Sequence, residues 1–115
     1  MTEGHTITIE PAGEHVAVLV DGETIAESDR AVVLRETGCP PRYYLPRDDI
    51  RGELLTPTDR SSTCQFKGQA SYWSVKVGDT VHDNIAWAYE EPIPRSEDIR
   101  GLVAFYNERV ELKVG

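Results

Sequence analysis

The chain has 115 residues, a net charge of −8 and 39% hydrophobic residues. This length is typical of a single domain with one hydrophobic core. The acidic charge disfavours nucleic-acid binding, because it repels phosphate backbones. No apolar run reaches the ~18 residues of a membrane-spanning helix, and the N-terminal MTEGHTITIE lacks an apolar signal region. We therefore expect a cytoplasmic protein that binds neither nucleic acid nor a membrane.

Cysteine and histidine are scarce and scattered. Cys39 and Cys64 are too few for a four-thiolate zinc site, and His5, His15 and His82 lack the close spacing of metal ligands. Without a secretory signal, reduced thiols are favoured over a disulfide between the two cysteines. The sequence therefore predicts no metal site and no cofactor.

Alternating and β-branched residues predict strands through the first third of the chain. The expected strands are Thr6–Glu10, His15–Val20, Glu23–Glu27 and Ala31–Arg35. The Asp21-Gly22 pair is typical of a two-residue hairpin turn. Such a turn places Val18 opposite Ile25.

The middle of the chain is rich in proline and polar residues. Gly38–Pro46 holds three prolines and should be stiff and extended, because proline fixes φ and restricts the residue before it. Arg42 and Arg47 lie in and beside it and could bind a carboxylate or a phosphate. Asp48–Leu55 could form one short helical turn, and the polar segment Leu55–Cys64 is predicted to be a loop.

Ala70–Val77 and Thr80–Glu90 predict the clearest hairpin, joined at Gly78-Asp79. A two-residue loop would pair Tyr72 with Ile85. Because strand side chains alternate, one face would then carry Tyr72, Ser74, Ile85, Trp87 and Tyr89. A single bulge would exchange the faces.

Prolines end that hairpin, and Ser96 is expected to cap a short turn over Glu97–Arg100. Leu102–Tyr106 and Val110–Val114 predict two last strands, and a helix over Ile99–Arg109 is the competing interpretation. Six to eight short strands with little helix indicate a mainly β domain, built as a small barrel or a sandwich.

Four motifs, in order, resemble a known family. They are PPRYYLPRDD (40–49), CQFKGQASYWSV (64–75), IAWAYEEP (85–92) and GLVAFYNERV (101–110). Together they resemble domain-of-unknown-function family 427, over about residues 16–112 of this chain. The resemblance implies a β-tent fold shared with zinc-ribbon-like proteins, but assigns no activity.

Two properties linked to that resemblance do not transfer. The chain has no CxxC motif to hold zinc. A nucleotidyltransferase-like label attached to the family would require carboxylates that hold magnesium. The nearest candidates, Asp48 and Asp49, are adjacent and would point apart on a strand, so this activity is disfavoured.

Residues 64–73, CQFKGQASYW, are the densest group of reactive and aromatic side chains. Cys64 and Lys67 are candidate catalytic residues, because a nearby ammonium lowers the pKa of a thiol. Asp49 is a candidate polar or proton-transfer partner. The alternative is that Cys64 is a small buried residue and Lys67 a structural or ligand-binding cation.

Five aromatic residues are candidate walls of a ligand pocket: Tyr43, Tyr44, Tyr72, Trp87 and Tyr89. Rigid aromatic rings stack on planar ligands at low entropic cost. The alternative is that these rings simply fill the core, with one residue of the Tyr43-Tyr44 pair pointing inward and the other outward.

The sequence thus supports two hypotheses for function. The first is a pocket for a small planar or anionic ligand around the CQFKG motif, with or without catalysis. The second is a non-catalytic interaction module or a homodimer that pairs through an exposed strand such as Val110–Val114.

Overall fold

A computed structural model describes residues 6–115 as ten strands in two antiparallel sheets, with three short 3-10 turns. The elements are β1 (Ile7–Pro11), β2 (Val16–Val20), β3 (Glu23–Ser28), β4 (Val32–Glu36), β5 (Arg42–Leu45), η1 (Arg47–Asp49), η2 (Gly52–Leu54), β6 (Leu55–Cys64), β7 (Gly68–Val77), β8 (Thr80–Ala88), η3 (Pro94–Ile99), β9 (Val103–Phe105) and β10 (Glu111–Val114). The mainly β fold predicted from the sequence is confirmed.

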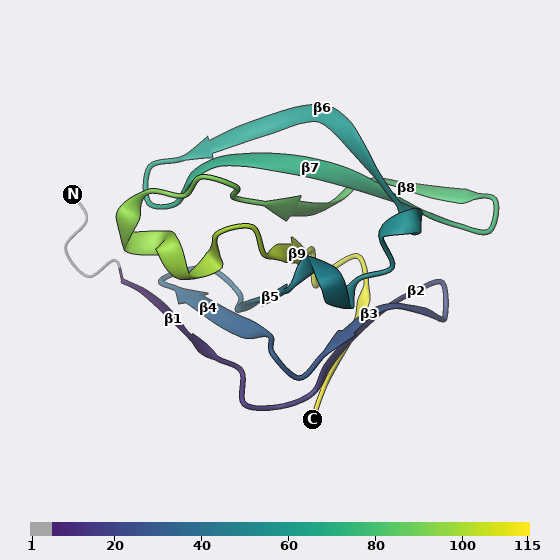
Figure 1. Ribbon diagram of the computed structural model, residues 1–115, viewed down its shortest axis with the longest axis horizontal. Helices are drawn as coiled ribbons and strands as arrows, with labels where there is room; N and C mark the ends of the chain where they lie inside the picture. The colour runs from purple at the N-terminus through teal and green to yellow at the C-terminus, as the bar shows by residue number, and fades with distance from the viewer. Residues whose placement is uncertain (1–5) are drawn as a thin grey trace.

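Seven strands form the larger sheet, in the order β1-β4-β5-β9-β8-β7-β6, and three form the smaller one, in the order β10-β2-β3. The larger sheet bends strongly, so that β6 and β7 lie above β1 and β4 in Figure 1, with β5 and β9 between them. Within residues 6–115 the bend does not close into a barrel, because β1 and β6 stay at opposite edges.

The two faces of the larger sheet bury different residues. An inter-sheet core lies against the smaller sheet and combines Val18 of β2 and Ile25 of β3 with Leu45, Val75 and Ile85 of the larger sheet. On the opposite, inner face lies an aromatic core. Its buried members are Leu34, Tyr44, Ala70, Tyr72, Trp87, Tyr89, Ile99 and Ala104. The larger sheet is therefore covered on both faces.

One predicted loop is a strand. Leu55–Cys64 forms β6, which pairs with β7 from Leu55↔Val75 to Cys64↔Gly68. Its side chains are polar because β6 is an edge strand whose residues are mostly exposed or half-buried, so it lacks the apolar alternation of the inner strands.

Bulges shift the register of both predicted hairpins. The Asp21-Gly22 turn forms, but a bulge after Val18 pairs that residue with Ala26 instead of Ile25. In the second hairpin, an irregularity between Trp73 and Val75 pairs Tyr72 with Trp87 instead of Ile85.

The second shift spans two residues, so the predicted shared face of Tyr72, Trp87 and Tyr89 is confirmed. Ile85 lies within the irregularity and turns to the inter-sheet core, contrary to the prediction.

The C-terminal third differs from its prediction in detail. Ser96 does not cap η3; its hydroxyl donates instead to the Phe66 carbonyl, which ties η3 to the β6–β7 turn. β9 inserts between β5 and β8, whereas β10 joins β2 in the smaller sheet. The competing helix over Ile99–Arg109 does not form.

No helix within residues 6–115 is long and apolar enough to cross a membrane.

Candidate functional site

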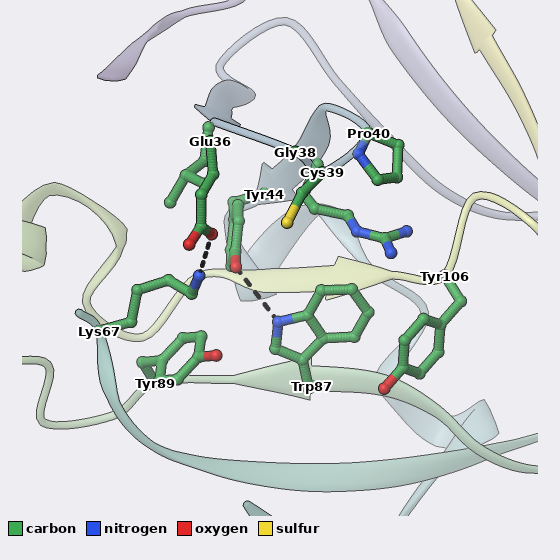
Figure 2. A pocket seen from close by; sticks show the side chains of 11 residues that line it. Glu36, Gly38, Cys39, Pro40, Tyr44, Lys67, Trp87, Tyr89 and Tyr106 are labelled. Carbon is green, nitrogen blue, oxygen red and sulfur yellow. Dashed lines mark hydrogen bonds and ion pairs between the residues drawn. The ribbon is translucent and has the colours of Figure 1, made fainter. Parts of the chain in front are cut away.

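A cavity of about 230 Å³ opens on the inner face of the larger sheet (Figure 2). Its walls come from β4, the β4–β5 loop, β5, the β6–β7 turn, β8 and the residue after β9. The lining residues are Leu34, Glu36, Gly38, Cys39, Pro40, Arg42, Tyr44, Lys67, Trp87, Tyr89 and Tyr106. We call this space the aromatic cavity.

One end of the cavity holds a nearly buried ion pair. The Lys67 Nζ atom lies 2.5 Å from Glu36 Oε1, and the two side chains are only 11% and 10% exposed. Figure 2 shows both side chains reaching toward each other beside Tyr89. A charged donor and a charged acceptor thus meet at one wall, where little water competes for them.

The turn between β6 and β7 places Lys67 at this wall. The Lys67 N–H donates to the Cys64 carbonyl, and its own carbonyl accepts from the Ile93 N–H. Gly68 follows at φ +118°, and a Cβ there would lie 3.3 Å from the Glu91 carbonyl oxygen and from Pro92 Cα. Glycine therefore allows the turn to pack against the segment after β8.

Tyrosines and Trp87 form the body of the cavity. The Trp87 Nε1–H donates to the Tyr44 hydroxyl over 3.2 Å, and the two rings meet edge to face with centroids 6.3 Å apart. Burial raises the pKa of both Tyr44 and Tyr89 far above the ordinary value. Like ordinary tyrosines, both hydroxyls are protonated at neutral pH and can donate hydrogen bonds, and burial keeps them protonated at higher pH as well.

Arg42 and Tyr106 form the other end of the cavity. The Arg42 guanidinium lies 5.4 Å from the Trp87 ring centroid and 5.5 Å from that of Tyr106. It is held by a two-pronged contact with Glu108, at 2.8 and 3.2 Å. This contact lowers the pKa of the Glu108 carboxyl. Arg42 is thereby fixed as part of the wall.

The structure brings four of the predicted site residues together at this cavity: Tyr44, Lys67, Trp87 and Tyr89. Tyr72 lies in the same aromatic core, but its hydroxyl is 2.8 Å from the Ser62 hydroxyl, at the side of the cavity. Tyr43 points the other way and packs on the inter-sheet core.

Two predicted catalytic candidates lie outside the cavity lining. Asp49 accepts hydrogen bonds from the Ser28 hydroxyl at 2.5 Å and from Arg30 at 3.1 Å, beside the smaller sheet. Cys64 is half-buried at the margin of the aromatic core. Neither is among the residues that line the cavity.

Several lining residues were not predicted as site residues, among them Glu36, Cys39 and Tyr106. Glu36 ends β4, 31 positions before its partner in the chain. Cys39 carries a free thiol, and Figure 2 shows its sulfur directed into the cavity. The sequence signal for Cys39 was its place in the same proline-rich segment as Tyr44.

Within residues 6–115, no three His, Cys, Asp or Glu side chains gather closely enough to hold a metal ion. His5 lies outside the described residues.

A family model described as a domain of unknown function, DUF427, matches residues 8–114, which is nearly the whole chain. No curated protein matches the chain.

Proposed function

Since the chain belongs to the DUF427 family, whose description names no activity, we propose a function from the cavity itself. The protein binds a small planar molecule in the aromatic cavity, and the Lys67–Glu36 pair hydrogen-bonds one edge of that molecule. The observation that carries this proposal is a nearly buried ion pair that opens on a space walled by aromatic rings.

The size and lining of the cavity support a ligand of one or two rings. Drug-sized ligands fill pockets of roughly 300–1,000 Å³, and this cavity of about 230 Å³ lies just below that range. Trp87, Tyr44 and Tyr89 offer faces and edges for stacking. Glu36 accepts and Lys67 donates, so the favoured ligand edge carries a donor beside an acceptor, such as an amide or a ring N–H next to a carbonyl.

The proposal is binding without covalent catalysis. The Lys67 ammonium is held by Glu36 and is not a free amine nucleophile. Cys64 and Asp49 are not among the lining residues, and Asp49 already has two partners.

A calorimetric titration of planar amides, nucleobases and aromatic acids tests the proposal. We expect at least one compound to bind the wild type and to lose at least tenfold in affinity in Lys67→Met. The matched control is Lys76→Met, which removes an exposed lysine from β7. If every compound that binds does so equally well to Lys67→Met, or if none binds, the cavity is not the site.

Pairing through a sheet edge is the second candidate. β10 lies at an edge of the smaller sheet, and Val114 on it is 37% exposed. Among the described residues, the other large hydrophobic side chain that is exposed is Val81, on a different sheet. Two separated valines are a small apolar area for a stable dimer, so this candidate is the weaker one. A concentration-dependent rise in sedimentation mass that Val114→Lys abolishes would favour it.

A further inference from the structure

A second hollow, of about 310 Å³, lies next to the aromatic cavity. It is lined by Arg60, Asp83, Asn84, Tyr106 and Arg109. Tyr106 lines both spaces, and its ring centroid is 4.5 Å from that of Trp87. One tyrosine side chain therefore forms the wall common to the two hollows. We call the second one the arginine hollow.

Two backbone irregularities on neighbouring strands build the arginine hollow. The β6–β7 pairing shifts between Pro57 and Ser61, and the β7–β8 pairing shifts between Trp73 and Val75. Arg60 lies in β6 at the first shift, whereas Asp83 and Asn84 lie in β8 at the second. Bulges of this kind re-aim side chains and recur beside functional sites.

Specific hydrogen bonds hold the two irregularities in place. Asn84 adopts φ +52°, in the left-handed region, and its N–H donates to the Ser74 hydroxyl over 3.1 Å. The Thr58 hydroxyl donates to Asn84 Oδ1 across the width of β7. Asn84 therefore holds an uncommon backbone conformation that hydrogen bonds with Ser74 and Thr58 stabilise.

The charge of the arginine hollow contrasts with that of the chain. Most arginines of this acidic protein are neutralised by carboxylates: Arg30, Arg35, Arg42, Arg51 and Arg100 each form an ion pair. Within residues 6–115, Arg60 and Arg109 have no carboxylate within ion-pairing distance, although both line one hollow. Asp83, the acid in the lining, accepts from the Ser74 hydroxyl at 3.4 Å.

Arg60 is oriented by the aromatic core. Its guanidinium lies 4.9 Å from the Tyr72 ring centroid. Planar arginine forks recognise carboxylates and phosphates in a two-pronged way.

From this arrangement we propose that Arg60 and Arg109 bind the anionic group, a carboxylate or a phosphate, of a ligand whose ring occupies the aromatic cavity. This inference rests on the proposed function and narrows its ligand to a planar ring that carries an acid on a short arm. The ring and the acid would lie on either side of Tyr106.

Matched pairs of neutral and acidic ligands test the inference by calorimetric titration. The pairs are indole with indole-3-acetate, and adenosine with adenosine 5′-monophosphate. The first pair tests a carboxylate and the second tests a phosphate. In the wild type, we expect the acid of at least one pair to bind about tenfold or more tightly than its neutral partner, as charged hydrogen bonds allow. In Arg60→Gln/Arg109→Gln, the acid should lose this advantage in affinity, while the neutral ligand should bind as it does to the wild type.

The control variant is Arg35→Gln, which removes a cation from the β1–β4 edge, where it pairs with Glu10. The inference is overturned if the acid gains nothing, if the gain survives in the double variant, or if Arg35→Gln removes it equally. In each of these cases the proposed function still holds, provided that a neutral ring compound binds the wild type and binds Lys67→Met more weakly.

If neither pair binds, the probe becomes inorganic pyrophosphate alone. Binding to the wild type that disappears in the double variant supports the part of the inference that assigns anion binding to Arg60 and Arg109. No binding overturns the inference. Both arginines are exposed, so the double variant should unfold at the wild-type urea concentration, which circular dichroism checks.

Discussion

The two faces of the larger sheet achieve burial in different ways. On the inter-sheet face, side chains such as Leu45, Val75 and Ile85 are fully buried and carry no polar atoms. On the inner face, Tyr44, Trp87 and the Lys67–Glu36 pair bring polar groups inside and leave a cavity between them. The first face provides stability by close packing, whereas the second leaves a space that, under the proposed function, holds a ligand. Changes on the two faces should therefore separate folding from binding.

The largest effect is expected on the inter-sheet face. Leu45→Ala should lower the free energy of unfolding by about 3 kcal/mol, because it removes buried methyl groups and leaves a void. Urea unfolding followed by circular dichroism measures the change. The control Val81→Ala, at a position that is 53% exposed, should stay within about 0.5 kcal/mol of the wild type. A loss below about 1 kcal/mol for Leu45→Ala would contradict this division of roles.

A smaller loss is expected from the ion pair. Lys67→Met should cost about 2 kcal/mol of unfolding free energy, because it removes the ammonium that lies 2.5 Å from the nearly buried Glu36 carboxylate. The double variant Lys67→Met/Glu36→Gln should recover part of that loss and, under the proposed function, should still fail to bind ligand. Recovery without binding would show that the pair serves recognition more than stability. Equal instability of the single and double variants would argue against that conclusion.

The Trp87–Tyr44 contact comes next. Tyr44→Phe should cost about 1.5 kcal/mol, because the buried Trp87 Nε1–H loses its acceptor. Tyr43→Phe is the matched control, since the neighbouring ring packs on the inter-sheet core, and it should change the unfolding free energy less than half as much. Similar losses for the two variants would remove the distinction between the faces.

The smallest effect depends on pH and lies outside the aromatic cavity. Hydrogen bonds from Ser28, and then from Arg30, hold the pKa of Asp49 below its ordinary value of 3.8. A lowered pKa in the folded state contributes stability above about pH 4 that is lost as the pH falls through the folded value. Ser28→Ala should therefore cost at most about 1 kcal/mol at pH 7, and less at pH 3. Urea unfolding at both pH values checks this, and an equal cost at both would contradict it.

The pKa values of the cavity tyrosines extend this contrast. Tyr44 and Tyr89 are protonated from pH 6 to 8, as ordinary tyrosines are, and burial extends this to higher pH. Binding that depends on their hydroxyls should thus be insensitive to pH from 6 to 8.

Alternation of apolar residues was sufficient to predict the mainly β fold and most inner strands. It failed at β6, because an edge strand with polar residues on both faces has the composition of a loop. Turn residues predicted both hairpins, but no residue pattern reveals a bulge such as the one that sends Ile85 to the opposite core. The register depends on two hydrogen bonds that form only in the folded sheet: the Asn84 N–H donates to the Ser74 hydroxyl, and the Thr58 hydroxyl donates to Asn84 Oδ1.

The candidate site was predictable only where neighbours in sequence are neighbours in space. Lys67, Trp87 and Tyr44 were found because each lies in a dense motif. Glu36 was not predicted, because nothing in the sequence distinguishes it from other acids at strand ends. Only the bend of the folded sheet brings the β6–β7 turn, and with it Lys67, to Glu36.

The two tryptophans lie on opposite faces of the larger sheet, and this gives the protein an internal optical probe. Trp87 lines the aromatic cavity, whereas Trp73 packs in the inter-sheet core with the Arg47 guanidinium 4.6 Å from its ring. In Trp73→Phe, all indole emission would come from the cavity wall. A ligand stacked there would quench or shift that emission directly, so the protein would report its own occupancy without any attached dye.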